Sequence, residues 1–211
     1  MLGLRLGTGP VNVLALGAHP DDIEIGCGGT LLQLGERPGT TVRGAILTGS
    51  PERSLEAAGA LEAFCPGAAL ETSTLPDGRL PGHWLEVKQT LHDLAARFAP
   101  DVVLCPRVDD AHQDHRLVGQ LASTVWRDVL ILQYEIPKWD ADLRPPTHYV
   151  SLTGEQARRK VDLLNAHYPS QHDRDWWDDE LFLGLMRVRG VECKSRYAEG
   201  FVSSKVAVVL T

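Results

Sequence analysis

Short apolar segments that alternate with helix-like segments constrain the fold of this chain more than any other feature. Residues 11–18 form a nearly continuous apolar run that ends at His19-Pro20, as expected for a strand buried on both faces of a parallel sheet. A helix-like segment follows at residues 28–36, and the alternation continues along the chain. This order predicts an α/β, Rossmann-like three-layer fold with a mostly parallel central sheet flanked by helices.

The rest of the chain supports the same interpretation. The segment 75–82 is rich in turn-forming residues and is expected to be a surface loop near the functional end of the sheet. No linker or internal repeat divides the 211 residues, so a single domain over residues 1–211 is expected. Further strands are predicted at residues 41–47, 101–105, 129–136 and 205–210, and further helices at residues 51–64, 84–98, 116–127, 154–166 and 175–188.

Composition and charge exclude several classes of function. The net charge is -7 and no long Lys/Arg run of the kind that binds nucleic acid or anionic lipid appears, which argues against both kinds of partner. The apolar runs are far shorter than the roughly 20 residues that span a bilayer, so no membrane span is expected. The first residues lack the pattern of a signal peptide, which predicts a cytoplasmic location. No C-x-x-C pair occurs, so buried, reduced thiols are expected at Cys27, Cys65, Cys105 and Cys193.

Polar side chains follow two of the predicted strands. The sequence H-P-D-D-I-E-I-G-C-G-G-T occupies residues 19–30, directly after the first strand. The sequence P-R-V-D-D-A-H-Q-D-H occupies residues 106–115, directly after the strand at 101–105. Open α/β sheets bind their ligands at the carboxyl ends of strands. If the two strands are neighbours, the two loops meet.

The residues in these loops are those of a metal-dependent hydrolase. Hydrolysis at zinc needs three protein ligands of the His or carboxylate type and one position open to water, whose pKa the metal lowers to about 7. His19, Asp22 and His115 supply such a set. Two histidines and one carboxylate also suit Fe²⁺, so zinc is the first choice of cofactor and iron the alternative. Asp21, adjacent to a ligand, is the natural general base for the water.

These motifs also carry a family resemblance. The pattern A-H-P-D-D-x-E-x-G-x-G-G-T, followed by H-x-D-H, resembles the LmbE-like, PIG-L family of zinc-dependent N-deacetylases. Members of that family deacetylate glucosaminyl phosphatidylinositol, the glucosaminyl precursors of mycothiol and bacillithiol, and glycosylated antibiotics. The resemblance implies zinc ligands at His19, Asp22 and His115, a general base at Asp21, and an oxyanion-binding histidine at His112.

Three further segments extend the resemblance over most of the chain. Residues 77–80 (D-G-R-L) are similar to a family D-G-x-L loop, and residues 197–201 to a Y-A-E-x-F tail. Residues 160–171 are similar to a K-x-x-A-x-x-x-H/Y-x-S-Q stretch, although Val-Asp-Leu follows Lys160 and displaces the small residue. The resemblance implies that Tyr197 reaches the oxyanion from a loop.

The combined prediction is a metal-dependent hydrolase that removes the N-acetyl group of a small-molecule amino sugar, its conjugate or an antibiotic intermediate. In that mechanism Asp114 is expected to orient His112 as a carboxylate behind the reacting groups. Arg79 and Arg107 are the basic residues best placed to bind substrate hydroxyl, phosphate or carboxylate groups. A homo-oligomer is compatible with the sequence.

Two other functions stay open at this point. An amidase that cleaves a thiol conjugate of the mycothiol type would use the same residues. A non-catalytic, Rossmann-like domain would instead bind a nucleotide at Gly26, Gly28 and Gly29, but the spacing G-x-G-G lacks the G-x-G-x-x-G pattern and favours close packing of helix on sheet. Trp139 and the pair Trp176-Trp177 are candidates for stacking on a sugar ring, although most tryptophans pack in cores.

Overall fold

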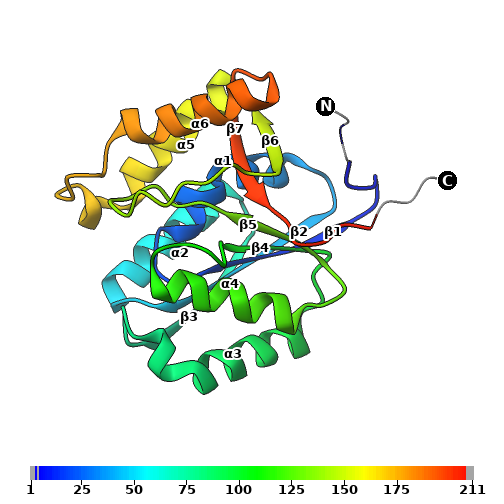
Figure 1. The fold of residues 1–211 in the computed structure, drawn as a ribbon, viewed down its shortest axis with the longest axis vertical. Coiled ribbons are helices and arrows are strands. Elements are labelled where there is room, and N and C mark those ends of the chain that lie inside the picture. The colour runs from blue at the N-terminus through cyan, green and yellow to red at the C-terminus, as the bar shows by residue number, and fades with distance from the viewer. Residues whose placement is uncertain (1–2, 4, 208–211) are drawn as a thin grey trace.

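A computed structural model, which describes residue 3 and residues 5–207, contains a seven-stranded sheet between two layers of helices (Figure 1). The strand order is β3-β2-β1-β4-β5-β7-β6. The first five of these strands are parallel, β7 is antiparallel to β5, and β6 is antiparallel to β7. The strands are β1 (Val11–Gly17), β2 (Thr40–Thr48), β3 (Ala69–Leu75), β4 (Val102–Pro106), β5 (Leu130–Tyr134), β6 (His148–Leu152) and β7 (Tyr197–Val202).

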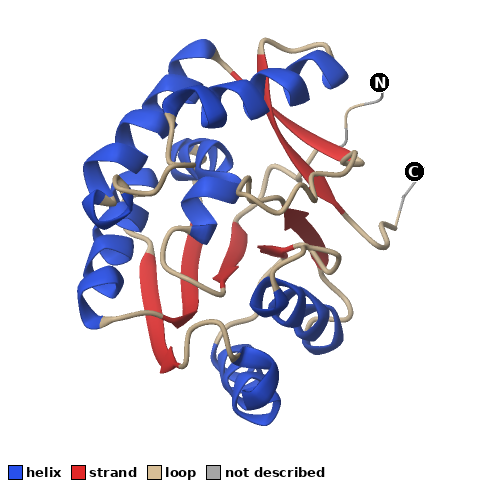
Figure 2. Cartoon of the chain, turned by 60° about the vertical axis from the view of Figure 1, so that its left-hand side comes forward, coloured by secondary structure: helices blue, strands red, loops and turns tan. Residues whose placement is uncertain are grey.

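Helices cover both faces of the sheet (Figure 2). One face packs against α1 (Asp22–Glu36), α2 (Pro51–Phe64), α5 (Gly154–His167) and α6 (Asp179–Cys193), and the other against α3 (Trp84–Arg97) and α4 (Gln113–Val125). Side chains of a strand point alternately to opposite faces, so Val13 enters the first core and Leu14 the second. The double-sided burial explains the continuous apolar run of β1. Two short 3-10 helices, η1 (Leu80–His83) and η2 (Pro169–Gln171), complete the structure.

The sheet brings the two polar loops together. β1 and β4 are direct neighbours, with Ala15 opposite Leu104, although about ninety residues separate them in the chain. The connections from β1 run outward to β2 and β3 on one side, and β4 begins the other side. Ligands bind at such a switch point in open α/β sheets. The mostly parallel α/β fold predicted from the sequence is therefore confirmed.

Helix α1 begins at Asp22, six residues before the predicted start at residue 28. The glycines weighed as a phosphate loop lie inside this helix, where neighbouring side chains leave no room for a Cβ atom. A Cβ added to Gly26 would lie 2.1 Å from the ring of Tyr134, and one added to Gly28 would lie 2.6 Å from Phe64. The preference for close packing over a phosphate loop agrees with these contacts.

Three strand predictions need correction. β3 and β6 were not predicted, because each lies at an edge of the sheet and exposes much of its length, which weakens the apolar signal. The last strand is Tyr197–Val202 rather than 205–210. Residues 205–207 are irregular, and 208–210 lie outside the described residues. Tyr197 therefore begins a strand instead of lying on a loop.

Two helices start at different residues from those predicted. α4 begins at Gln113 rather than 116, with His112 accepting the backbone N–H of Asp114 as its cap. α6 spans 179–193 rather than 175–188, because the carboxylate of Asp178 caps the backbone N–H groups of the first turn. The remaining boundaries agree with prediction to within two residues. Within the part of the chain that is described, none of the helices has the length and apolarity to cross a membrane.

Candidate metal centre and active site

The loops after β1 and β4 bring three predicted metal ligands into contact. His19 Nδ1 lies 3.1 Å from His115 Nε2, and Asp22 Oδ1 lies 3.2 Å from the same Nε2 atom. Asp22 Oδ2 completes the triangle at 3.5 Å from His19 Nδ1. All three side chains are buried. Two imidazoles and one carboxylate therefore lie together at the carboxyl edge of the sheet.

Two of these separations fit a tetrahedral metal ion. Bonds of about 2.0–2.1 Å at tetrahedral angles place ligand atoms about 3.3 Å apart, and the distances from His115 Nε2 to His19 Nδ1 and to Asp22 Oδ1 lie close to that value. Asp22 turns its other oxygen, Oδ2, toward His19. The donor set of two imidazoles and one carboxylate is one that binds Zn²⁺ or Fe²⁺. His19, Asp22 and His115 thus fit a divalent transition metal in both geometry and chemistry.

The ligand carboxylate is held by the backbone. Asp22 Oδ2 accepts hydrogen bonds from the backbone N–H groups of Ala18 and His19, both at 2.8 Å. Burial by itself would raise the pKa of Asp22, but the adjacent His115 and His19 hold that pKa well below its usual range. The carboxylate is therefore ionised and oriented before any metal binds.

Carboxylates also lie behind each ligand histidine, on the side away from the triangle. His19 Nε2 is 3.3 Å from Asp114 Oδ2 and 3.1 Å from Asp77 Oδ1. His115 Nδ1 is 3.1 Å from Asp110 Oδ2, an ion-pair distance without hydrogen-bond alignment. Carboxylates in this position fix the ring orientation of a metal-bound histidine and raise its basicity.

The negative charge of the site favours a bound cation. Burial by itself lowers the pKa of His19, but the charge of Asp22 and hydrogen bonds to carboxylates raise it to about 12. In the same way, burial by itself lowers the pKa of His115, but Asp22 and Asp110 raise it to about 9. The cluster therefore holds positive charge strongly, and a divalent ion bound to the two imidazoles would take the place of their protons.

Asp114 contacts a different histidine from the one expected. Its carboxylate lies against His19 and accepts the backbone N–H groups of Gly78 and Leu80, at 2.8 and 3.0 Å. Only its backbone N–H reaches His112, donating to Nδ1 at 3.2 Å. The reason is helical geometry: in the first turn of α4, the side chain of Asp114 points to the turn-rich loop while its amide points back to the cap. Asp114 thereby joins the 77–80 loop to the ligand His19.

His112 lies against both histidines of the triangle, with one ring nitrogen of each of the three histidines within 4.8 Å of the others. Its ring is 4.8 Å from that of His19 and 4.6 Å from that of His115, measured between centroids. Because Nδ1 accepts the Asp114 N–H, the neutral ring carries its proton on Nε2. Burial and the positive charge of His115 and His19 lower the pKa of His112, which favours that neutral form. His112 thus offers an N–H donor at the centre.

Asp21, the neighbour of Asp22 in the chain, is also buried but contacts a different group, Arg53. It is the N-cap residue of α1, with a φ of 102° in the left-handed region, which costs a non-glycine residue about 1–3 kcal/mol. Its Oδ2 accepts a hydrogen bond from Arg53 Nη2 at 2.8 Å, and Arg53 also donates to Pro20 O. Burial raises the pKa of Asp21 to about 7, against the opposing effect of Arg53.

Several of these residues were not identified from the sequence. Arg53 lies on α2, thirty-two residues after Asp21, and carries no motif. Asp110 is anchored at 2.9 Å by Lys138 from the loop after β5. An acidic residue next to H-x-D-H was a visible signal for Asp110, whereas nothing in the sequence marked Arg53 or Lys138.

Comparison with known proteins identifies the family. Residues 14–126, more than half of the chain, match the GlcNAc-PI de-N-acetylase (PIG-L) family. The chain belongs to this family. The match includes both polar loops, and it confirms the family predicted from the sequence.

Relatives of this PIG-L member support the assignment. The uncharacterised deacetylase YaiS of Escherichia coli (strain K12) is 29% identical over 168 residues, which cover 74% of this chain and 89% of YaiS. N,N'-diacetylchitobiose deacetylase from Pyrococcus horikoshii has a TM-score of 0.74 and 21% identity, covering 91% of this chain and 83% of that one. GalB, the 4-carboxy-2-hydroxymuconate hydratase of Pseudomonas putida KT2440, has a TM-score of 0.80 and 19% identity, covering 95% and 99%. The fold alone therefore does not determine the reaction.

Two further charged residues of the family-like segments, Lys160 and Glu199, bind the backbone on both sides of a kink in α1. At Cys27 the helix leaves helical geometry (φ -143°, ψ 24°), which frees backbone groups on both sides. Glu199 accepts the N–H groups of Gly29 and Thr30, both at 2.7 Å. Lys160 donates to Ile25 O at 2.6 Å and to Glu199 at 2.7 Å. The amides that a nucleotide phosphate would need are thus occupied by Glu199.

We expect Glu199→Gln to destabilise the protein by about 3–5 kcal/mol, because it leaves the charge of Lys160 buried without a partner. Both side chains are almost fully buried. Urea unfolding followed by circular dichroism measures the change. The matched control is Glu71→Gln, which breaks an exposed ion pair with Arg97 and should cost at most about 1 kcal/mol. Equal losses of stability for the two substitutions would contradict a stabilising role for the buried Glu199–Lys160 pair.

The three residues predicted to bind substrate differ in how exposed and how engaged their side chains are. Arg107 is buried and donates to both oxygens of Asp109, so its guanidinium is already engaged. Arg79 is exposed and follows the loop that holds Asp114. Tyr197 packs against the core, with the guanidinium of Arg196 over its ring. Of the three, Arg79 has a free charged group next to the site.

Proposed function

We propose that this PIG-L member is a zinc-dependent hydrolase that removes the N-acetyl group of an amino sugar or amino-sugar conjugate. The observation that carries the proposal is the buried triangle of His19, Asp22 and His115, flanked by a base at Asp21 and an N–H donor at His112. These are the parts that amide hydrolysis needs: a metal site, a proton acceptor and an oxyanion donor.

His19, Asp22 and His115 would hold the metal. When bound, zinc lowers the pKa of a water molecule to about 7 and polarises the amide carbonyl. The carboxylates of Asp114 and Asp110 keep the two imidazoles in the tautomers that leave Nδ1 of His19 and Nε2 of His115 free for the ion.

Asp21 takes the proton of the attacking water and later delivers it to the leaving amine. Its contacts support this role, because the Asp21 carboxylate binds Arg53 whereas that of Asp22 binds backbone N–H groups and the two histidines. The hydrogen bond from Arg53 leaves Asp21 Oδ1 without a charged partner on its own side, so one oxygen is oriented by Arg53 while the other can receive a proton. The two adjacent aspartates therefore have different roles: Asp22 would hold the metal, and Asp21 transfers the proton.

His112 donates its Nε2 proton in a hydrogen bond to the oxygen on which negative charge develops. We expect His112→Ala to lower kcat about 100-fold or more, which is the usual effect of removing one oxyanion donor. KM should change much less, because the interaction strengthens only as the charge forms. Steady-state acetate release measures both constants.

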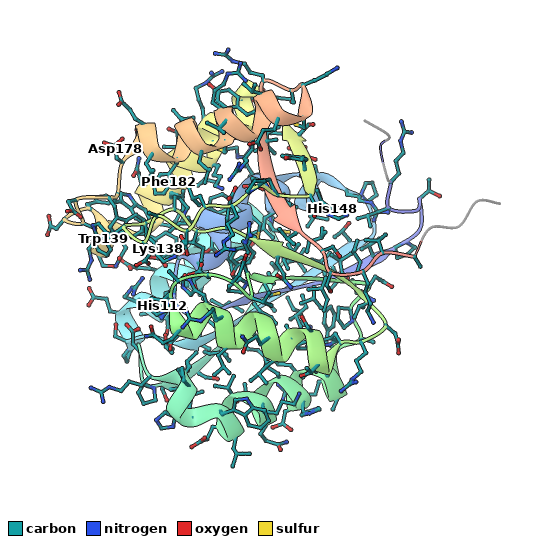
Figure 3. The ribbon with its side chains drawn as sticks, in the orientation of Figure 1. His112, Lys138, Trp139, His148, Asp178 and Phe182 are labelled. Atoms are coloured by element: carbon teal, nitrogen blue, oxygen red, sulfur yellow. The ribbon has the colours of Figure 1, made fainter. Side chains whose placement is uncertain are left out.

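The matched control for this prediction is His148→Ala. His148 begins β6 and lies on the side of the molecule away from His112 (Figure 3). It should keep the activity of the unchanged protein. A His112→Ala variant with normal kcat would remove His112 from the mechanism.

The rim of the site carries groups that suit sugar hydroxyls. Asp77 places one oxygen 3.1 Å from His19 Nε2, yet its side chain is 62% exposed. Arg79, two residues further on, is also exposed. A carboxylate and a guanidinium in the exposed loop beside the buried His19 can accept from and donate to vicinal hydroxyl groups of a pyranose.

A screen for acetate release tests the proposal. The substrates are N-acetylglucosamine glycosides, nucleotide-linked amino sugars, N-acylated antibiotic intermediates and a thiol conjugate of the mycothiol type. Release from at least one N-acetylated amino sugar, and its loss on treatment with a chelator, is the expected result. Cleavage of the thiol conjugate alone would replace the proposal with the amidase alternative. Failure on every substrate with zinc-loaded protein would contradict hydrolysis.

A further inference from the structure

An exposed tryptophan lies on the loop between β5 and β6, residues 135–147. Trp139 is 63% exposed, although tryptophan carries a large apolar surface that proteins usually bury. Its ring is nevertheless fixed: the indole N–H donates to Asp175 Oδ1 at 2.9 Å, and the ring meets that of Trp176 edge-on at 5.9 Å and 78°. The exposed aromatic face is thus presented in one orientation.

The aromatic side chain that contacts Trp139 is itself held by packing against its neighbours. Trp176 contacts Trp177, at 5.6 Å between centroids, and meets Phe182 of α6 at 6.5 Å in a T-shaped arrangement. Both tryptophans are half-buried against the core. A tryptophan held by such neighbours loses little conformational entropy when a ligand binds its free face.

This loop is joined to the metal centre. Lys138, the residue before Trp139, binds Asp110, which faces the ligand His115. On the other side, Asp142 accepts the backbone N–H of Ala111 at 2.6 Å, immediately before His112. Figure 3 shows Trp139 and Lys138 at the same edge of the molecule as His112. The loop that carries the aromatic face is therefore anchored to the segment that carries His112 and His115, while the ring itself contacts Asp175 and Trp176.

The charge around Trp139 limits what can bind there. Residues 138–144 and 173–180 contain seven carboxylates and only three cationic side chains. Lys138 is engaged by Asp110, Asp140 and Asp142, which leaves the rim strongly acidic. An acidic rim repels phosphorylated ligands and accepts hydrogen bonds from hydroxyl or ammonium groups.

We propose that Trp139 is the stacking platform of a second sugar-binding position, next to the ring that carries the scissile acetamide. The apolar C–H face of a neutral or amine-bearing sugar covers the indole, while the carboxylates around it bind hydroxyl or ammonium groups. The preferred substrate class is then a neutral or cationic glycoside of at least two rings, rather than a free monosaccharide or an anionic nucleotide sugar. This inference rests on the proposed deacetylase function.

The test compares two ligands and three variants. N,N'-diacetylchitobiose, a two-ring ligand, and N-acetylglucosamine are titrated by calorimetry into zinc-loaded Asp21→Asn protein, alone and combined with Trp139→Ala, Trp139→Phe or Val191→Ala. Val191 is an equally exposed apolar residue near the far end of α6 and serves as the control. Acetate release from the same sugars and from a nucleotide-linked N-acetylglucosamine is measured with Asp21 intact.

We expect Trp139→Ala to weaken disaccharide binding about tenfold and to leave monosaccharide binding unchanged, with Trp139→Phe recovering most of the loss. The unchanged enzyme should prefer the disaccharide to both other sugars in kcat/KM. Equal loss for the two ligands, or no loss for either, would overturn the platform while leaving the deacetylase proposal intact. A preference for the nucleotide sugar would also overturn it. Absence of acetate release from every sugar would overturn the proposed function and this inference together.

Discussion

Asp21→Asn is expected to lose nearly all hydrolysis while it keeps its metal. The substitution preserves the shape of the side chain and can still accept the hydrogen bond from Arg53, so the fold of the loop should not change. It removes the only function assigned to Asp21, the transfer of a proton from water to the leaving amine. General acid–base groups contribute about 10²–10⁴-fold, and a loss in that range is expected in kcat.

Two measurements on the same preparation decide this prediction: kcat for acetate release, and zinc per chain by atomic absorption. Retained zinc with lost turnover is the expected pair of results. Near-normal turnover would remove Asp21 as the base. Loss of zinc along with activity would mean that Asp21, and not only Asp22, holds the metal.

His115→Ala should instead fail at the earlier step of metal binding. It removes one of three donor atoms and leaves Asp22 and Asp110 facing each other without the charge between them. Changing a residue behind a metal ligand typically costs 10–100-fold in affinity, so loss of the ligand itself should exceed about 100-fold. Competition with a fluorescent zinc chelator measures the dissociation constant.

The matched control is His92→Ala, which changes an exposed histidine on α3. It should bind zinc as tightly as the unchanged protein. If His115→Ala also retained full zinc affinity, the triangle of His19, Asp22 and His115 would not be the metal site.

The proximity of the proposed metal ligands was predictable because each lies in a polar segment that follows a buried strand, His19 and Asp22 after β1 and His115 nine residues after β4. The apolar runs that end at Ala18 and at Cys105 define those strand ends without any knowledge of the tertiary structure. Parallel strands then carry both loops to one edge of the sheet. The proximity of His19 and His115 follows from these two facts once β1 and β4 are neighbours.

The residues that support the ligands were not predictable in the same way. Arg53 reaches Asp21 from α2, and Lys138 reaches Asp110 from a loop after another strand. Such contacts depend on helix placement and loop path, which a local sequence pattern does not encode. The target of Asp114 was missed for a related reason, since the start of α4 determines whether its carboxylate points to His112 or to His19.

Some elements of the fold were likewise predictable from the sequence and others were not. Strands buried on both faces, such as β1 and β4, were located to within one residue, because burial leaves a continuous apolar run. The edge strands β3 and β6 leave no such run, since one side of each has no partner strand. The start of α1 was hidden by glycines whose presence reflects packing against Tyr134 and Phe64 rather than a turn.

We propose that one metal ion bound by His19, Asp22 and His115 is required for hydrolysis of an N-acetyl group. The most direct test is acetate release from an N-acetylated amino sugar by protein stripped of metal and titrated with zinc. The account predicts no turnover in the stripped protein and full recovery at about one zinc per chain, as expected for a single three-ligand site. Undiminished acetate release by metal-free protein would contradict it.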